Sequence, residues 1–409
     1  MECEGGVRHK ASKKRGFNNI PKPCIVTIEE GRETLFIKRG YLLLLAGVLI
    51  GFLAFSMISL LYSGGRVQYG EGEMPNLIEI EFLYTSEKQG WIEEVTPKFE
   101  EWFKVRFGID IRVRLVVTGT HDTVNRILDG SERPTVWSPA SSIWIPYLNM
   151  KWRNVTGNDY DIAVDWTPLV LSPVVLASWR SHIEKWNITG FMDLYRLAKE
   201  GVNFKYGHPD PLLSNGGAMT VILEFAEAAG KRPEDLTIED LKNETVIEIV
   251  KTIESKAIYY GKSTGFFGAW AAENGPDAIH FFGIYENVVL DNSFKAFKKW
   301  NDSIVAVYPK KGTLMSDHPF VILNATWVNR WQRFAAGQYL FFLLKPENQE
   351  LAQRHGFRPA NSGVPLDQEL FNPSNGVQYE IRVPILKPLR GEVMEAIFTA
   401  WVKVRNTGV

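Results

Sequence analysis

The feature that most constrains this chain is an uncharged apolar segment near its N-terminus. Residues 41–62 (YLLLLAGVLIGFLAFSMISLLY) are 22 consecutive positions without a charged side chain. At about 1.5 Å per residue, a helix of that length spans roughly 33 Å, which matches the hydrocarbon core of a bilayer. Tyr41 and Tyr62 stand at the two ends, where aromatic rings favour the membrane interface. The segment is therefore predicted to be a transmembrane helix.

Charges on either side of this segment predict its orientation. Residues 1–40 carry nine Lys/Arg and five acidic residues, and Lys38 and Arg39 adjoin the span. The positive-inside rule then makes 1–40 a basic cytoplasmic tail and places 63–409 outside a single-pass cell-membrane protein. A cleaved signal peptide is the alternative, because the small residues of 63–65 follow the span. Its apolar region would usually be shorter, about 7–15 residues.

The cysteines and the glycosylation sequons agree with this orientation. Cys3 and Cys24 are the only cysteines, so the outer region has no disulfide framework. Five N-x-[ST] sequons all lie outside and predict candidate glycosylation sites. Their asparagines are Asn154, Asn187, Asn243, Asn301 and Asn324.

Composition excludes several classes of function. The formal net charge is −1, so no basic excess indicates a nucleic-acid partner. Hydrophobic residues make up 45%, which is enough to bury a core and excludes a disordered chain. No complete P-loop is present in the sequence.

Beyond a linker predicted at 63–75, strands alternate with amphipathic helices. Strands are predicted at 77–84, 109–117, 135–136, 170–177, 304–308 and 320–323. Helices are predicted at 90–107, 122–128, 190–200, 218–230, 238–255, 331–344, 346–355 and 393–404. This order predicts an α/β fold with mainly parallel sheets. About 334 residues exceed one comfortable doubly wound domain, so two lobes are expected.

Five junctions, which follow short apolar runs or open a predicted helix, collect hydroxyl groups and glycines. Open α/β sheets bind ligands at the carboxyl ends of their strands, and a helix N-terminus there offers free N–H groups. Ordinary helix capping is the alternative, since Ser, Thr and Asn are common N-caps. The junctions are Thr85-Ser86, Thr118-Gly119-Thr120, 138–141 (SPAS), 214–217 (SNGG) and 263–265 (STG).

Two weaker patterns suggest other chemistry. Residues 261–265 (GKSTG) match the GxSxG nucleophile elbow, which requires a strand before it and a helix after it. The following FFGAWAAENG is a poor helix candidate, so a catalytic Ser263 is not expected. His208-x-Asp210 and Asp317-His318 are pairs without a third ligand, so no metal and no cofactor is predicted. Arg358 is expected to form a structural salt bridge.

Four segments in register resemble one family. They are TVWSPASSIW at 135–144, FKYGHPDPLLSNGG at 204–217, VYPKKGTLMSDHPF at 307–320 and QELAQRHGFRP at 349–359. They are similar to stretches of the extracellular solute-binding proteins of ABC transporters, which have the type II periplasmic-binding fold. Some relatives bind molybdate-like oxyanions.

The resemblance implies two lobes that close on a solute by hinge motion. Lobe one would be 76–168 plus 320–409 and lobe two 169–319, with crossovers at 166–176 and 318–327. On the matching stretches, the cleft would be lined by Trp137, Ser138, Ser214, Asn215 and Gly217. The junctions add Thr85, Ser86, Thr118, Gly119, Thr120, Ser263 and Thr264, and Glu286 and Tyr308 are further candidates.

The predicted function is therefore a membrane-anchored extracellular solute-binding protein. It would capture a small polar or anionic solute, such as an oxyanion or a sugar, and present it to an ABC permease. Two alternatives remain at this point. One is a tethered hydrolase that uses Ser263, and the other is a surface sensor or interaction module on the same fold.

Overall fold

The computed structural model describes residues 75–406, which fall in a compact unit that runs from Pro75 to Val409. The predicted cytoplasmic tail (1–40), transmembrane helix (41–62) and nearly all of the linker (63–75) lie outside the described residues. Among the residues that are described, no helix is long and apolar enough to cross a bilayer.

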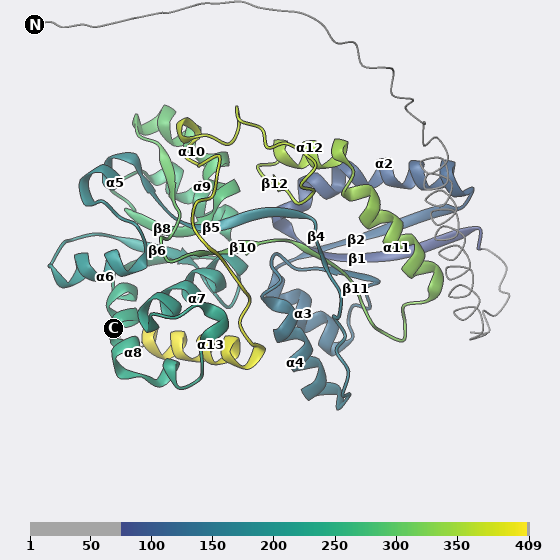
Figure 1. Cartoon of the computed structure of the whole chain (residues 1–409), viewed down its shortest axis with the longest axis horizontal. Coiled ribbons are helices and arrows are strands. Elements are labelled where there is room, and N and C mark those ends of the chain that lie inside the picture. The colour runs from purple at the N-terminus through teal and green to yellow at the C-terminus, as the bar shows by residue number, and fades with distance from the viewer. Residues whose placement is uncertain (1–74, 407–409) are drawn as a thin grey trace, which may run out of the picture. The chain divides into compact units, whose positions relative to one another are not determined.

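Two sheets organise the described residues, and Figure 1 shows their strands as two groups. In the first sheet β1 pairs in parallel with β2 and β3, whereas β11 is antiparallel to β3 and β4. The strand order is β2 (Asp110–Thr118), β1 (Leu77–Thr85), β3 (Val136–Ser138), β11 (Pro319–Ile322) and β4 (Thr167–Pro168).

The second sheet is built around the long strand β5 (Val170–Trp179). It continues on one side through β8 (Phe281–Tyr285), β6 (Tyr206–Pro209) and β7 (Ala257–Gly261), and on the other through β10 (Thr313–Ser316) and β13 (Ile385–Leu386). β9 (Ile304–Val307) and β12 (Arg358–Pro359) also pair with β5. Because β5 is antiparallel to all four neighbours that contact it, the prediction of mainly parallel sheets is wrong and both sheets are mixed.

The strand-forming pattern is clearest in β1. Its residues alternate between exposed and buried at the start and are buried at the end, as expected of a strand covered on one face and then on both. The parallel register sets Glu79 opposite Arg112 and Glu81 opposite Arg114, and each pair forms a salt bridge. The charged residues of β1 and β2 therefore share the solvent face.

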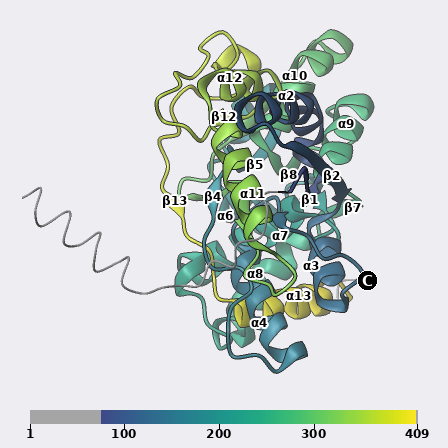
Figure 2. The same cartoon turned by 90° about the vertical axis from the view of Figure 1, so that its right-hand side faces the viewer.

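Helices cover both sheets. Next to the first sheet lie α2 (Gln89–Phe107), α3 (Thr120–Asp129) and α11 (Arg330–Leu343), while α12 (Pro346–Arg354) packs on α2, α11 and β12. The second sheet contacts α5 (Arg180–Trp186), α7 (Asn215–Ala229), α8 (Glu244–Glu254), α9 (Thr264–Asn274) and α10 (Glu286–Trp300), while α6 (Phe191–Lys199) packs on α7 and α8. α13 (Gly391–Asn406) lies beside α4 (Trp144–Thr156) and also contacts α7 and α8 (Figure 2). All the helices predicted from periodicity are present, so those predictions are confirmed.

One helix contradicts the sequence prediction. Residues 264–274, judged a poor helix candidate, form α9. Ser263 caps it by accepting a hydrogen bond from the Phe266 N–H. Gly268 packs against α10 so closely that a Cβ there would meet Val288 Cγ1 at 2.2 Å. Tertiary packing thus outweighs the low intrinsic helix propensity of glycine.

The chain passes directly between the sheets at two places. β4 belongs to the first sheet and β5, which follows it, to the second; β10 belongs to the second sheet and β11 to the first. The two passages touch, because the Leu169 N–H points at the carbonyls of Asp317 and His318, at 3.3 Å each. They fall within or next to the segments predicted as crossovers. Within 320–409, α11 packs on the first sheet whereas β12 and β13 pair in the second, and the lobe boundaries stay a prediction.

A buried ion pair fixes β12 to the second sheet. Arg358 donates through Nε to Glu286 Oε2 at 2.6 Å and through Nη2 to Glu286 Oε1 at 2.8 Å. Arg358 also donates to the carbonyls of Gln378 and Tyr379, and the Tyr308 hydroxyl donates to Glu286. The expected salt bridge of Arg358 is confirmed.

Replacing Glu286 by Gln should destabilise the fold strongly, because it leaves a buried guanidinium without its counter-charge. Urea denaturation should show a loss of about 3 kcal/mol in the free energy of unfolding. Glu79→Gln is the matched control, since its pair with Arg112 is exposed and should lose less than about 1 kcal/mol. Equal effects of the two substitutions would contradict a structural role for the Arg358–Glu286 pair.

Candidate functional site

The predicted junctions all follow strand ends. Thr85 ends β1, Thr118 ends β2 and Ser138 ends β3; Ser214 is the N-cap of α7 and Ser263 the N-cap of α9. Polar side chains from both sheets meet here, and they are nine-tenths or more buried. We call this set the junction cluster: Thr85, Lys88, Ser138, Ser214, Asn215, Thr264, Tyr285, Ser316 and His318.

Asn215 links helix α4 to the second sheet. Its Oδ1 accepts a hydrogen bond from Trp144 Nε1 at 2.7 Å, and its Nδ2 donates to the Tyr285 hydroxyl at 2.7 Å. Trp144 begins α4, in the segment that follows β3, and Tyr285 ends β8. Next to Asn215, the hydroxyls of Ser214 and Thr264 lie 2.9 Å apart. The starts of α7 and α9 are thereby held together.

Lys88 is buried, and its amino group has three polar partners. Nζ donates to Thr85 Oγ1 at 3.0 Å and to the Ser138 carbonyl at 2.9 Å, and it lies 3.5 Å from His318 Nδ1. Burial lowers the pKa of Lys88 to about 7, although the nearby carboxylates of Glu87 and Asp317 act in the opposite direction. The amino group of Lys88 therefore uses its hydrogen-bonding capacity within the protein.

Hydrogen-bond roles assign the tautomer of His318. Ser316 Oγ donates to the Ala140 carbonyl at 2.6 Å, so its 3.2 Å contact with His318 Nε2 must use that nitrogen as the donor. His318 Nδ1 is then the acceptor for Lys88. Burial, reinforced by the charge of Lys88, lowers the pKa of His318 well below its usual value and keeps the ring neutral. The backbone of His318 has a φ of 42°, a left-handed conformation rare for a residue other than glycine.

Two polar atoms at this place have no hydrogen-bond partner among residues 75–406. They are Ser138 Oγ and Glu87 Oε2, and both atoms are buried. Glu87 lies in the turn after β1 and acts on Tyr285: burial raises the pKa of Tyr285 well above its usual value, and the Glu87 carboxylate raises it further. Buried polar groups without partners are costly, and they are common where a ligand completes the structure.

Other predicted site residues are engaged elsewhere. Thr118 donates to Asp122 at 2.7 Å, and Trp137 is fully buried with its Nε1 donating to Thr123 at 2.8 Å. Glu286 and Tyr308 belong to the Arg358 cluster. These contacts do not bring the four residues together with the junction cluster.

The remaining predicted residues border the cluster or shape the backbone around it. Thr120 Oγ1 accepts from the Ala140 N–H at 3.4 Å, and Gly119 faces the Leu213 carbonyl. Ser86 and Gly119 are exposed. Ser263 acts as a helix cap through Phe266.

Gly217 has a packing role, because a Cβ there would lie 1.9 Å from the Pro209 carbonyl oxygen.

Sequence reasoning missed five members or neighbours of the cluster. Lys88, Trp144, Tyr285, Ser316 and His318 were not proposed as site residues, although Asp317-His318 was noted as a possible metal pair. Their roles depend on tertiary contacts, since Lys88 reaches His318 across 230 positions of the chain. The available signal was their position, directly at or after strand ends.

Two α/β sheets with strand ends facing a shared buried polar cluster define a binding protein of the two-lobed type. The family model described as bacterial extracellular solute-binding protein matches residues 80–358. The chain belongs to this family. The family consists of binding proteins, so the prediction of a binding protein rather than an enzyme is confirmed.

Solved structures show the same fold at low identity. A solute-binding protein of an ABC transporter from Thermotoga lettingae, bound to α-D-tagatose, is 12% identical with a TM-score of 0.54, covering 81% of this chain and 94% of its own. The ferric binding protein from Campylobacter jejuni is 15% identical with a TM-score of 0.53, covering 80% and 98%. A periplasmic thiamin binding protein is 12% identical with a TM-score of 0.51, covering 82% and 98%. A comparison with curated proteins gave no match.

Gly217→Ala should destabilise the chain because the added methyl group would overlap a backbone carbonyl. We expect a loss of about 3 kcal/mol in the free energy of unfolding, measured by urea denaturation. Gly265→Ala is the control, because a Cβ there meets nothing within 4 Å. That variant should be neutral or more stable by up to about 1 kcal/mol. A neutral Gly217→Ala would show that backbone clearance is not its role.

Lys88 predicts a specific dependence of stability on pH. Its folded pKa of about 7 lies below the unfolded value of about 10.4, so the unfolded chain binds more protons between these values. Stability from this group is therefore present at pH 10 and is lost as the pH falls toward 7. Between pH 9 and 7 the wild type should lose about 2 kcal/mol more than Lys88→Met, measured by urea denaturation. Lys98→Met, at an exposed position, should keep the wild-type slope.

Proposed function

We propose that this chain is a membrane-anchored extracellular solute-binding protein that captures a small polar solute at the junction cluster and delivers it to an ABC permease. Membership of the family supports the class of function. The three solved structures described above are bound to or named for chemically different solutes, tagatose, ferric iron and thiamin, so the fold alone does not fix the solute. The site residues must supply that information.

The observation that carries the proposal is the pair of unpartnered atoms, Ser138 Oγ and Glu87 Oε2. Ser138 ends β3 and Glu87 follows β1, so both atoms belong to the first sheet, while Glu87 acts electrostatically on Tyr285 of the second. A solute that bonds both atoms and also reaches Tyr285 would contact both sheets. Such a solute would also favour the closed arrangement over an open one, because it binds both halves only when they are close.

The charges favour a solute that donates hydrogen bonds. A bound oxyanion needs several free donors, but Lys88 Nζ already has three partners, which leaves the Ser138 hydroxyl as the one unpartnered donor among the described residues of the junction cluster. Glu87 Oε2 is a carboxylate oxygen that accepts hydrogen bonds, and its negative charge would repel an anion. We therefore propose a sugar, a polyol or an amine in preference to an oxyanion such as sulfate.

Closure would bury the solute and supply oriented hydrogen bonds without covalent chemistry. In this proposal lobe one comprises 76–168 plus 320–409 and lobe two 169–319. The paired passages around Leu169 and His318 would act as the hinge, since hinges are formed by a few residues that absorb backbone rotation.

Membrane anchoring would come from residues 41–62, with 1–40 in the cytoplasm and the binding region outside. The asparagines of all five sequons are exposed, which supports their use as glycosylation sites.

Ser138→Ala should weaken solute binding while leaving the fold intact. Its hydroxyl has no protein partner, so the free energy of unfolding should change by less than about 0.5 kcal/mol. Loss of a hydrogen bond to the solute should reduce affinity at least about tenfold, or about 1.4 kcal/mol. The measurement is native mass spectrometry of the full chain with co-purifying solute, followed by thermal-shift titration with monosaccharides, polyols, amines, sulfate and phosphate.

Ser178→Ala is the matched control, because Ser178 is equally buried but donates to the His280 carbonyl away from the cluster. It should lose about 1 kcal/mol of stability and keep the affinity of the wild type. Unchanged affinity in Ser138→Ala would contradict the proposed site. Stabilisation by sulfate or phosphate alone would contradict the donor-bearing solute while leaving the class of function intact.

A further inference from the structure

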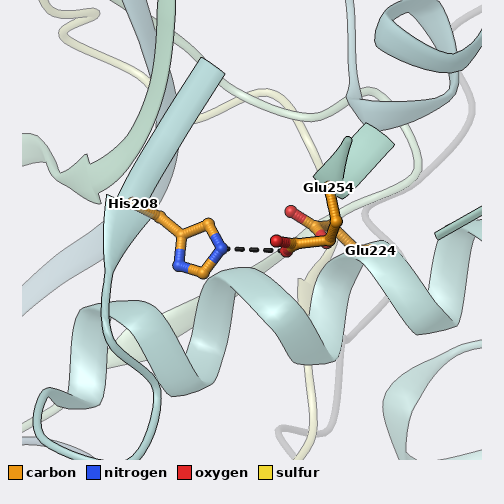
Figure 3. Close-up of side chains that lie close together, drawn as sticks. All are labelled: His208, Glu224 and Glu254. Atoms are coloured by element: carbon orange, nitrogen blue, oxygen red, sulfur yellow. Dashed lines mark hydrogen bonds and ion pairs between the residues drawn. The ribbon is translucent and has the colours of Figure 1, made fainter. Parts of the chain in front are cut away.

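A second buried polar cluster lies beneath the loop that leads to Asn215. His208 on β6, Glu224 on α7 and Glu254 on α8 each direct one ligand atom to a common point, and these atoms all lie within 4.8 Å of one another. The three residues, here called the His208 cluster, are at most 5% exposed. Figure 3 shows the imidazole facing the two carboxylates.

The hydrogen-bond roles of His208 place two acceptor atoms, His208 Nε2 and Glu254 Oε1, against each other. His208 Nδ1 lies 2.7 Å from the Pro209 carbonyl, which only accepts, so Nδ1 carries the hydrogen. In the neutral ring Nε2 then has a lone pair, yet it faces Glu254 Oε1 at 2.9 Å. Two acceptors at this distance require a positive species between them, either a proton or a metal ion. An Nδ1–H bound to a backbone carbonyl is also the usual arrangement of a metal-binding histidine.

The second carboxylate points into the same space. Glu224 Oε2 is buried and has no hydrogen-bond partner within the described part of the chain, whereas Glu224 Oε1 accepts from the Tyr206 hydroxyl. Glu254 Oε2 accepts from the Tyr260 hydroxyl at 2.5 Å. Each carboxylate is thus oriented by a phenol on one oxygen, Glu254 presents its other oxygen to His208, and Glu224 also offers an oxygen to the same space. Outer hydrogen bonds of this kind hold ligand groups in position at metal sites.

We propose that His208, Glu224 and Glu254 bind one divalent transition-metal ion, and we assign Zn²⁺ as the ion that suits one imidazole and two carboxylates. Bonds of about 2.0–2.2 Å would require the Nε2 and Oε1 atoms to separate by only a few tenths of an ångström from their present distance. Two carboxylates would balance the charge of the ion in a place without solvent.

The location indicates a structural role and not that of a transported solute. Trp401 of α13 covers the cluster, with its ring 6.1 Å from that of His208 and 5.4 Å from that of Tyr260. Arg405 of the same helix pairs with Asp210 at 3.5 Å. A metal ion here would join β6, α7 and α8 at the base of the loop that positions Ser214 and Asn215. The inference stands independently of the identity of the solute.

The test is the metal content of the full chain, purified without chelator and measured by inductively coupled plasma mass spectrometry. We expect about one zinc per chain. Removal of zinc by a chelator should lower the melting temperature, and added ZnCl₂ should restore it, because an ion that binds only the folded state stabilises it. X-ray absorption at the zinc edge should show nitrogen and oxygen ligands and no sulfur.

Two variants and a control locate the ion. His208→Asn and Glu224→Gln should each reduce zinc affinity at least about tenfold. His355→Asn is the control, because His355 contacts only the surface carboxylate of Glu94 in its ion pair and should retain the metal. If His208→Asn fails to fold, the wild-type content, the ZnCl₂ titration and Glu224→Gln decide the question.

Absence of stoichiometric metal together with no response to ZnCl₂ would overturn the proposal and assign the cluster to shared protons. Zinc affinity in Glu224→Gln equal to that of the wild type would overturn it as well.

Discussion

A directed series of hydrogen bonds runs from the Lys88 amino group through His318 and Ser316 to the Ala140 carbonyl. It lies where the chain passes between the two sheets, so the arrangement of the strand ends depends on it. Each contact in the series has one assigned direction, and reversing any of them leaves a buried group unpaired. A buried lysine is expensive, and the three polar partners of its amino group are what make its burial tolerable.

Because the polar groups between the two sheets are so fully paired, an unpaired atom among them indicates a place where a ligand could bind. Most polar groups around the passages have partners within the protein, including Asn215, Ser214 and Thr264. Against that background, Ser138 Oγ and Glu87 Oε2 stand out as buried polar atoms without a partner in the described part of the chain. The same reasoning applies beneath α7, where Glu224 Oε2, near His208, lacks a partner among the same residues. The two places differ in chemistry: the first mixes hydroxyls with one carboxylate, and the second gathers two carboxylates around an imidazole.

Much of the fold could be predicted because it depends on local patterns. Alternation in 77–84 and helical spacing in 90–107 identify β1 and α2, and the hydroxyl-rich stretches mark the ends of strands. Residues whose roles depend on distant contacts could not be predicted in this way. Lys88 resembles any lysine in a short turn until His318 is placed beside it. Gly268 reads as a helix breaker until α10 is packed against it.

In the candidate site too, residues marked by a local pattern could be predicted, and residues defined by distant contacts could not. Ser214, Asn215 and Thr264 were identified from their junctions, and they lie together. Trp137 was chosen for its aromatic ring, but its neighbours place that ring in the core, because Thr123 takes its only N–H. Glu286 carries a charge that the Arg358 guanidinium already neutralises, and a sequence does not reveal such a pair from residues 72 positions apart.

The bond between Trp144 and Asn215 has a consequence for kinetics. It ties the beginning of α4 to the beginning of α7 through two buried side chains. A buried hydrogen bond that must break before two elements separate adds to the activation free energy of that separation. Any opening between the starts of α4 and α7 would therefore be slowed by this contact.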